Sequence, residues 1–224
     1  MNVIAINGSP RKKWNTATML EHALSGAESK GAKTELIHLY DYDFKGCHSC
    51  FACKAKDGIS YGRCAVRDGI TPILEKIHDD ADAVIFGTPF YFGTMTGMMR
   101  SFTERLMFSH LVYAIPPASL FPRKINTAFI YTMNVGAEHF EEMKYPVHIK
   151  SNEWALSMIS GRPAESLQAF ATKQFDDYSK YVFGLGDPVE RVRNAEKAFP
   201  EDCKKAYDLG VRMASLPSEP PPGG

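Results

Sequence analysis

The sequence predicts an α/β fold in which a parallel β-sheet is covered by helices on both faces. Two short, continuous apolar runs, at residues 3–6 and 83–86, are typical of strands buried on both faces. Each run leads through a loop into a segment whose apolar residues recur at helical spacing. Strands that alternate with helices in this way favour parallel pairing, because parallel neighbours need a crossover connection.

Strands and helices are expected to alternate along the first half of the chain. Strands are expected at residues 3–6, 34–38 and 83–86. The second helix is expected to start at Asp68, with Pro72 in its first turn. The helices are indicated by apolar side chains three and four residues apart. These are Leu20, Ala23, Leu24 and Ala27 in the first helix, Ile70, Ile73, Leu74 and Ile77 in the second, and Met98, Met99, Phe102 and Leu106 in the third.

The second half of the chain has weaker patterns. A fourth strand is expected at residues 128–131 and a fifth at 167–171. Residues 138–165 are interpreted as an irregular insertion with one short helix around Trp154 and Met158. Helical spacing returns from Val189 to about Met213, with a break expected at Pro200, because proline removes a backbone donor and crowds the preceding turn.

Composition favours a single domain over residues 1–215. Of the 224 residues, 44% are hydrophobic, which is enough to fill one core. Residues 216–224 are rich in Pro and Gly and are expected to be disordered. The 26 basic residues balance the 26 acidic ones, so charge predicts neither nucleic acid nor an anionic membrane as a partner. The chain opens directly on a strand, and no apolar stretch approaches the ~20 residues that cross a bilayer. We therefore expect a cytoplasmic protein.

The loop after the first strand is suited to holding a phosphate. A helix N-terminus carries unsatisfied N–H groups and the positive end of the helix dipole. Ser9 and Thr16 add hydroxyl groups, Asn15 an amide and Arg11 a guanidinium. Neither the Walker A pattern nor the G-x-G-x-x-G pattern is present, since Gly8 is the only glycine of the turn. The alternative is an ordinary turn whose helix is capped by a Thr18–Glu21 capping box.

The loop after the third strand is suited to holding a flat ring. In open α/β sheets the ligand lies beyond the carboxyl ends of the strands. Pro89 and Gly93 keep the backbone close to such a ring, and Phe90, Tyr91 and Phe92 supply apolar surface. The alternative is an aromatic hairpin that packs into the core.

Four of the five cysteines lie in one segment, residues 46–68. Cys47, Cys50 and Cys53 are three residues apart, and Cys64 follows after ten intervening residues. This clustering indicates a metal or an iron–sulfur cluster, and the compact triplet matches part of a bacterial ferredoxin motif. A tetrahedral zinc site is a second interpretation. Unligated or redox-active thiols are a third.

The two loops resemble those of the flavodoxin-like NAD(P)H-dependent FMN reductases, and especially of their iron–sulfur flavoprotein branch. The resemblance rests on G-S-P-R-x-x-x-N-T at residues 8–16 and G-T-P-F-Y-F-G-T-M-T-G at residues 87–97. It implies a flavodoxin-like three-layer fold with a five-stranded parallel sheet in the order 2-1-3-4-5. It also implies bound FMN, with NAD(P)H as co-substrate, and a homodimer or homotetramer.

The resemblance also assigns roles to individual residues. The FMN phosphate is expected at Ser9, Arg11, Asn15 and Thr16. The ring is expected along Pro89, Phe90, Tyr91, Phe92 and Gly93, and the loop after the fourth strand, with Asn134 and Gly136, is expected to close its other side. The cysteine ligands of a [4Fe–4S] cluster are expected to be Cys47, Cys50, Cys53 and Cys64. The ten residues before Cys64 are more than the compact motif of the iron–sulfur branch has.

The function expected from these features is that of an FMN-dependent oxidoreductase. It takes electrons from NAD(P)H and passes them to a small acceptor such as a quinone or a flavin. Because FMN carries this chemistry, no catalytic side chain is expected. One alternative is an iron–sulfur flavoprotein that relays electrons from ferredoxin through a [4Fe–4S] cluster to FMN. Another is a non-redox binding module with a zinc-stabilised loop.

Overall fold

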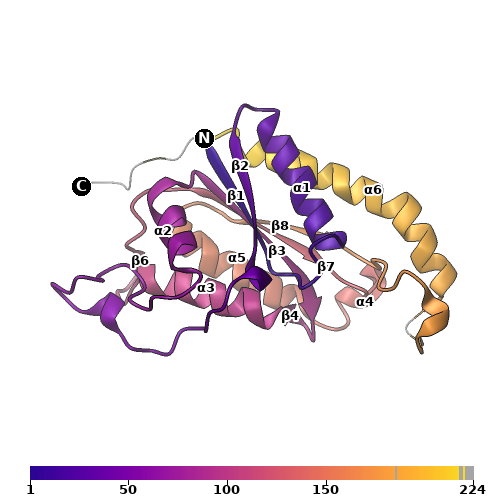
Figure 1. Cartoon of the computed structure of the whole chain (residues 1–224), viewed down its shortest axis with the longest axis horizontal. Coiled ribbons are helices and arrows are strands. Elements are labelled where there is room, and N and C mark those ends of the chain that lie inside the picture. The colour runs from indigo at the N-terminus through magenta and orange to yellow at the C-terminus, as the bar shows by residue number, and fades with distance from the viewer. Residues whose placement is uncertain (185, 217–218, 220–224) are drawn as a thin grey trace.

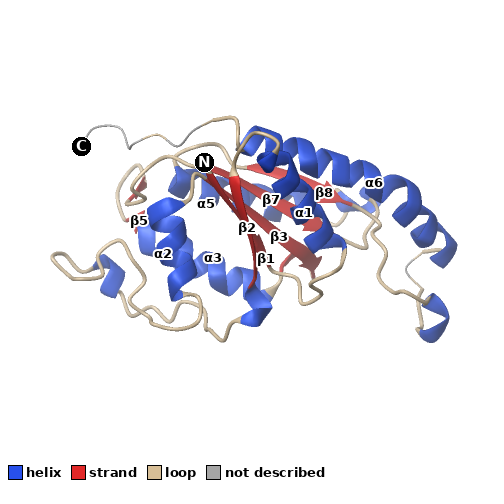
Figure 2. Ribbon diagram, turned by 45° about the horizontal axis from the view of Figure 1, so that its top comes forward, coloured by secondary structure: helices blue, strands red, loops and turns tan. Residues whose placement is uncertain are grey.

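A parallel sheet forms the centre of the protein. The computed structural model describes residues 1–184, 186–216 and 219, and all structural statements refer to these residues. Five parallel strands lie in the spatial order β2, β1, β3, β7 and β8. They are β1 (Asn2–Asn7), β2 (Lys33–His38), β3 (Ala83–Tyr91), β7 (Asn126–Thr132) and β8 (Glu165–Ala169). Counted along the chain, this is the predicted order 2-1-3-4-5. The three-layer flavodoxin-like prediction is confirmed (Figures 1 and 2).

Helices cover both faces of the sheet. They are α1 (Asn15–Glu28), α2 (Thr71–Asp80), α3 (Gly97–His110), α4 (Ala137–Phe140), α5 (Tyr145–Ser160) and α6 (Pro188–Met213). Successive side chains of a strand point to opposite faces, so each face has its own core. Val3 and Ala5 of β1 belong to the core under α1 and α6, whereas Ile4 and Ile6 belong to the core under α2, α3 and α5.

Three short extensions complete the fold. β4 (Thr94–Met95) pairs with the end of β3 in antiparallel orientation. β5 (Leu111–Val112) and β6 (Ala118–Ser119) form a separate two-stranded hairpin after α3. Single turns of 3₁₀ helix lie at Leu39–Asp41, Ala52–Lys54 and Tyr178–Lys180.

The expected break at Pro200 is wrong, because α6 runs through it as one helix of 26 residues. Asp187 caps its start by accepting a hydrogen bond of 2.8 Å from the Val189 N–H. All of its buried residues follow Pro200, from Asp202 to Met213, and this half packs against α1. Capping and packing together outweigh the cost of proline inside the helix, about 3 kcal/mol.

Glycine permits the close crossing of α1 and α6. A Cβ atom on Gly210 would lie 1.7 Å from the Ala23 carbonyl oxygen, and one on Gly26 would lie 2.0 Å from the Tyr207 carbonyl oxygen. Both contacts are to backbone, which cannot rotate away. The two helices therefore lie side by side along the sheet (Figure 1).

Two expected segments differ in extent. The insertion at 138–165 contains α5, a helix of 16 residues, which is longer than the expected short helix; Gly161 ends it in a left-handed conformation. β8 begins two residues before the expected start of the fifth strand.

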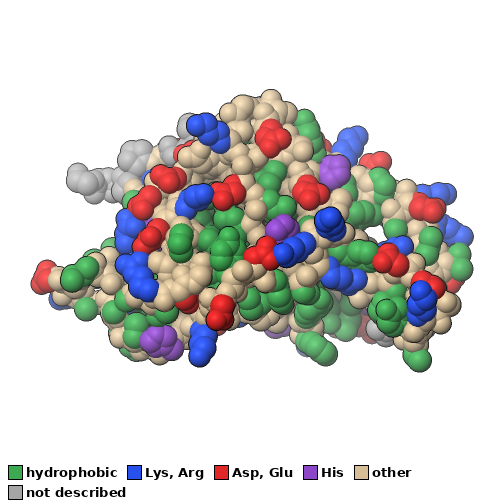
Figure 3. Space-filling view, viewed as in Figure 1, with side chains coloured by type: hydrophobic (Ala, Val, Ile, Leu, Met, Phe, Trp, Pro, Cys, Tyr) green, Lys and Arg blue, Asp and Glu red, His purple; other side chains and the backbone are tan. Residues whose placement is uncertain are grey.

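The tail and the surface complete the description. Most of the tail predicted to be disordered, 216–224, falls outside the described residues; within it, Glu219 pairs with Lys124 and Arg162. No described helix is long and apolar enough to cross a membrane. Acidic and basic side chains are interspersed over the face in Figure 3, in keeping with the zero net charge.

The helix crossing gives a stability prediction. Gly210→Ala should lower the free energy of unfolding by about 2–3 kcal/mol, because α6 must move away from Ala23. Gly97→Ala is the control, since a Cβ there meets nothing within 4 Å; it should change stability by less than about 1 kcal/mol. Urea unfolding of both variants measures the difference, and equal stabilities would contradict the close crossing.

Candidate functional site

A large cleft lies at the carboxyl ends of the parallel strands. Its volume is about 890 Å³, which is within the range of small-molecule and cofactor sites. Most of the predicted cofactor residues line it, from three separate loops. These are Ser9, Arg11, Asn15, Thr16, Pro89, Phe90, Tyr91, Phe92, Asn134 and Gly136. Gly93 does not line the cleft. A Cβ atom added at Gly93 would lie 3.2 Å from the ring of Tyr145.

The predicted phosphate loop is ordered by its own side chains. The Asn7 carboxamide oxygen accepts from the Ser9 N–H at 2.9 Å, and the Ser9 hydroxyl accepts from the Arg11 N–H at 3.2 Å. Helix α1 begins at Asn15 with no side chain capping its N-terminus. Thr18 lies inside the first turn, so the capping-box alternative does not describe this helix. Its N-terminal N–H groups border the cleft and suit an anion.

A wall of the cleft that the sequence analysis missed comes from residues 173–174. The Lys173 carbonyl oxygen accepts from Trp14 Nε1 at 3.1 Å and from Asn15 Nδ2 at 2.9 Å. The Gln174 carbonyl oxygen accepts from Arg11 Nη1 at 2.6 Å. Three polar side chains of the phosphate loop are thus held at the cleft by a segment about 160 positions later.

The aromatic loop forms a tight hairpin. Phe92 and Gly93 connect β3 to β4, and both have positive φ, 49° and 85°. This is the pattern of a type I′ turn, in which phenylalanine is strained because its Cβ crowds the backbone. Phe92 is fully exposed, whereas Phe90 packs edge-to-face on Tyr131 and Tyr145. The core-hairpin alternative therefore fits Phe90 but not Phe92.

The loop after β7 presents an unpaired polar atom. Met133 fixes this loop by donating its N–H to the Ala169 carbonyl at 2.9 Å and accepting from the Thr172 hydroxyl at 3.1 Å. The next side chain, Asn134, has a buried Oδ1 that finds no hydrogen-bond partner among the described residues. An orphaned buried acceptor beside an open cleft is costly unless a ligand donates to it. The N–H groups of a flavin ring are donors of this kind, so the site fits FMN.

The four clustered cysteines line one small cavity. Cys47, Cys50, Cys53 and Cys64 all border it, together with Arg105 and Phe108 of α3. Burial raises the pKa of the Cys53 thiol, Lys54 lowers it, and the neighbouring Cys64 and Cys50 raise it again, which reflects how close these thiols lie.

The backbone of the cysteine segment is strained on both sides of Cys50. Ser49 and Phe51, on either side of Cys50, both have φ of 57°. Left-handed residues at alternate positions form concave backbone sites of the type that holds phosphates and iron–sulfur clusters. Such strain is concentrated at functional sites.

The cysteine cavity does not form a site for a single metal ion, because no three His, Cys, Asp or Glu side chains of the described residues are placed to hold one ion. A cluster binds each thiolate to a different iron, so its ligands stand further apart. The cavity is about 20 Å³, the size of one water molecule, so the thiols must move outward to accept a cluster. Cys50 is exposed and forms the outer side.

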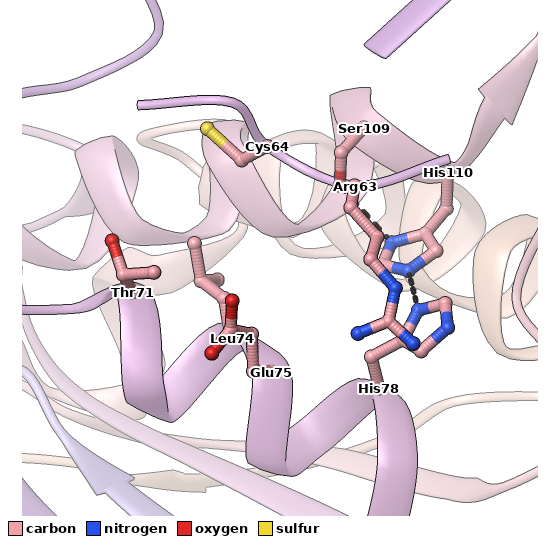
Figure 4. Close-up of a pocket in the computed structure, with 8 residues that line it drawn as sticks. All are labelled: Arg63, Cys64, Thr71, Leu74, Glu75, His78, Ser109 and His110. Atoms are coloured by element: carbon pink, nitrogen blue, oxygen red, sulfur yellow. Dashed lines mark hydrogen bonds between the residues drawn. The ribbon is translucent and has the colours of Figure 1, made fainter. Parts of the chain in front are cut away.

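His78 and His110 form a hydrogen-bonded pair that lines a small cavity together with Cys64. His110 Nδ1 is 2.6 Å from the Leu106 carbonyl oxygen, which can only accept, so Nδ1 carries the proton. His110 Nε2 then accepts from Nδ1 of His78 at 2.8 Å (Figure 4). Burial lowers the pKa of His110 to about 4 and also lowers that of His78. The pair is therefore neutral at neutral pH.

The histidine pair predicts acid sensitivity. Between pH 6.5 and about 4 the unfolded chain binds a proton at His110 that the folded protein excludes, so stability falls as the pH falls through this window. The loss approaches about 3 kcal/mol at the lower end. Urea unfolding at pH 7 and pH 5 measures the part of this stability loss that occurs above pH 5. His110→Asn, which keeps a donor toward Leu106, should flatten the pH dependence; an unchanged slope would contradict the assignment.

Comparison with known proteins finds relatives that are named iron–sulfur flavoproteins. An iron–sulfur flavoprotein from Archaeoglobus fulgidus is 41% identical over 105 residues, covering 47% of this chain and 48% of the relative. Another from Methanocaldococcus jannaschii is 35% identical over 105 residues, covering 47% and 51%. The matched part thus spans about half the length of these relatives.

Solved structures share the fold over the whole chain. An NAD(P)H:quinone oxidoreductase from Methanothermobacter marburgensis matches with a TM-score of 0.66 and 14% identity, covering 95% of this chain and 98% of that one. An azoreductase from Bacillus anthracis matches with a TM-score of 0.64 and 11% identity, covering 95% and 99%. The model of the family "NADPH-dependent FMN reductase" matches residues 1–137. The chain therefore belongs to the NADPH-dependent FMN reductase family.

Proposed function

We propose that this protein is an electron-transfer oxidoreductase of the iron–sulfur flavoprotein kind, with FMN in the cleft and a [4Fe–4S] cluster on the cysteine segment. Electrons enter from a one-electron donor such as ferredoxin and leave to a small acceptor. The observation that carries this proposal is that all four clustered cysteines line one cavity, although Cys64 is separated from the others. Relatives that bear the name iron–sulfur flavoprotein support it.

The residues around the cleft would bind and orient FMN. The N-terminus of α1, with Ser9 and Thr16, would hold the phosphate, and Arg11 would turn from the Gln174 carbonyl to bond it. Asn134 Oδ1 would accept from the ring and so lose its unpaired state. The backbone from Pro89 to Phe92 would lie against the ring. When bound, FMN supplies the hydride and single-electron chemistry, so no side chain need act as acid or nucleophile.

The cysteine segment would hold the cluster through Cys47, Cys50, Cys53 and Cys64. The thiols of Cys53 and Cys64 lie on the inner side, and the exposed Cys50 lies on the outer side. Phe51 and Phe108 contact each other edge-to-face beside the cavity, with 5.9 Å between their ring centroids. Solvent exposure around a cluster is one of the means by which proteins set its potential.

Direct reduction by NAD(P)H is the second candidate function. The match to a family described as NADPH-dependent FMN reductase favours it. The cleft also has aromatic walls beyond the predicted ring site, at Tyr145 and Phe183, where a flat nicotinamide, quinone or flavin would fit. Such an enzyme could keep its cysteines as free thiols.

The proposal includes a homodimer or homotetramer in the cytoplasm, with no nucleic acid or membrane partner. The fully exposed Phe92, together with Met143 and Val147, places apolar surface beside the cleft. A second subunit that covered this surface would also shield the ring site from water.

Loss of the Arg11 guanidinium should weaken FMN binding. Arg11→Ala should cost about 1.5–3 kcal/mol, the usual worth of a hydrogen bond to a charged group. Lys13→Ala removes a charge from the same loop without touching the cleft and should leave affinity nearly unchanged. Titration of the apoprotein with FMN, followed by flavin fluorescence, compares the two. Equal affinities for Arg11→Ala and the parent would remove Arg11 from the phosphate site.

Anaerobically purified protein tests the cofactors and the electron donor together. The proposal predicts flavin absorption, a broad iron–sulfur shoulder and about four irons per chain. In stopped-flow mixing, reduced ferredoxin should bleach the flavin rapidly and NADPH slowly. Fast bleaching by NADPH in a sample without iron would favour the second candidate. A colourless sample that does not bind added FMN would overturn both.

A further inference from the structure

We propose that Arg105 is a positioning residue that holds Cys64 in place as the fourth ligand of the cysteine cavity, and that this compensates for the long spacing between Cys53 and Cys64. The inference rests on the proposed cluster but concerns residues of this chain outside the cysteine pattern. Arg105 would explain how the Cys64 thiol reaches the same cavity as the other three cysteines.

The extra residues between Cys53 and Cys64 are looped out. The Gly62 N–H donates to the Cys53 carbonyl at 3.1 Å, which closes residues 54–61 into a side loop. Gly62 has φ of 76°, a left-handed conformation that favours glycine. Inside the loop, consecutive tight turns carry the chain out and back. Cys64 therefore follows this closure by only two residues.

Lys54 fastens the start of the side loop to the end of α3. Its ammonium group donates to the carbonyl oxygens of Phe108, Ser109 and Leu111. These carbonyls lie at the C-terminal end of α3, where a positive charge is favoured. The side loop thus begins at a fixed point, and the position of Cys64 depends on what holds its other end.

Arg105 holds that other end. It is only 1% exposed, and its guanidinium lies between the two ends of the 46–68 segment. Nε donates to the Cys64 sulfur at 3.3 Å, and Nη2 donates to the Val66 carbonyl at 3.0 Å. Nη1 donates to the Lys45 carbonyl at 3.2 Å and to the Asp68 carboxylate. One side chain thus joins the residues before Cys47 to those after Cys64.

The chemistry of this contact requires arginine. Its planar fork presents donors in several fixed directions, whereas a lysine ammonium is a compact charge on a flexible chain. A buried cation that only filled space would be costly, and here each bond satisfies a group of the cysteine segment. The Nε bond also directs a positive charge at the sulfur that would be the ligand.

The test compares Arg105→Lys with Cys64→Ser after anaerobic reconstitution with ferrous iron and sulfide. If Arg105 positions Cys64, both variants should fall from about four irons per chain to about three, since three thiolates remain. Both should show the same three-iron electron paramagnetic resonance signal. FMN content should be unchanged, which reports that the fold is intact. Arg100→Lys, an exposed position on the same helix, is the matched control and should keep four irons.

Other outcomes separate the inference from the proposed function. If the parent binds FMN but takes up no iron, the cluster and the inference are both overturned. If Arg105→Lys or Cys64→Ser keeps four irons and the parental spectrum, the inference alone is overturned. If Arg105→Lys does not retain FMN, Asp68→Asn decides: partial conversion to the three-iron signal supports the inference, and full four-iron loading overturns it.

Discussion

The hydroxyl of Thr96 connects the parts on which both candidate sites depend. This buried side chain donates to the Gly8 carbonyl at 2.8 Å and accepts from the Met99 N–H at 3.3 Å. Its own N–H donates to the Thr88 hydroxyl at 3.1 Å. The phosphate loop, the end of β3 and the start of α3 are therefore joined at one residue. Gly8 is required there, because a Cβ would lie 2.8 Å from Met99.

Helix α3 continues this connection toward the cysteine segment. Thr96 caps one end of the helix, and Arg105 and Phe108 contact the cysteine cavity near the other end. With 14 residues, the helix is about 21 Å long. Among the described residues, no side chain lines both the cleft and the cysteine cavity. Flavin content can therefore serve as a measure of folding in cysteine variants.

Local patterns allowed the alternation of strands and helices and both cleft loops to be predicted from sequence, whereas the sheet order was implied by the family resemblance. The candidate binding residues of each loop lie within a few positions of one another, at 8–16 and 87–97, and apolar periodicity indicates the helices that follow. The cleft wall at Gln174 and the contacts of Arg105 could not be predicted, because they depend on partners about 160 and up to 60 positions away. The prediction of a helix break at Pro200 was wrong because the packing of the residues after Pro200 outweighs the cost of a proline inside the helix. The cysteine ligands remain a prediction, which the shared cavity supports.

The crossing of α1 and α6 has a consequence for the width of the cleft. α1 starts at the phosphate loop, and α6 starts beside Glu190 and Arg191 on another side of the same cleft. The helices touch at Gly26 and Gly210, far from both starts, so the angle at which they cross affects the distance between those starts. A small rotation there is magnified along the 22 residues from Gly210 back to Pro188. The spacing between the two helix starts at the cleft therefore depends in part on two buried glycines that lie outside the cleft lining.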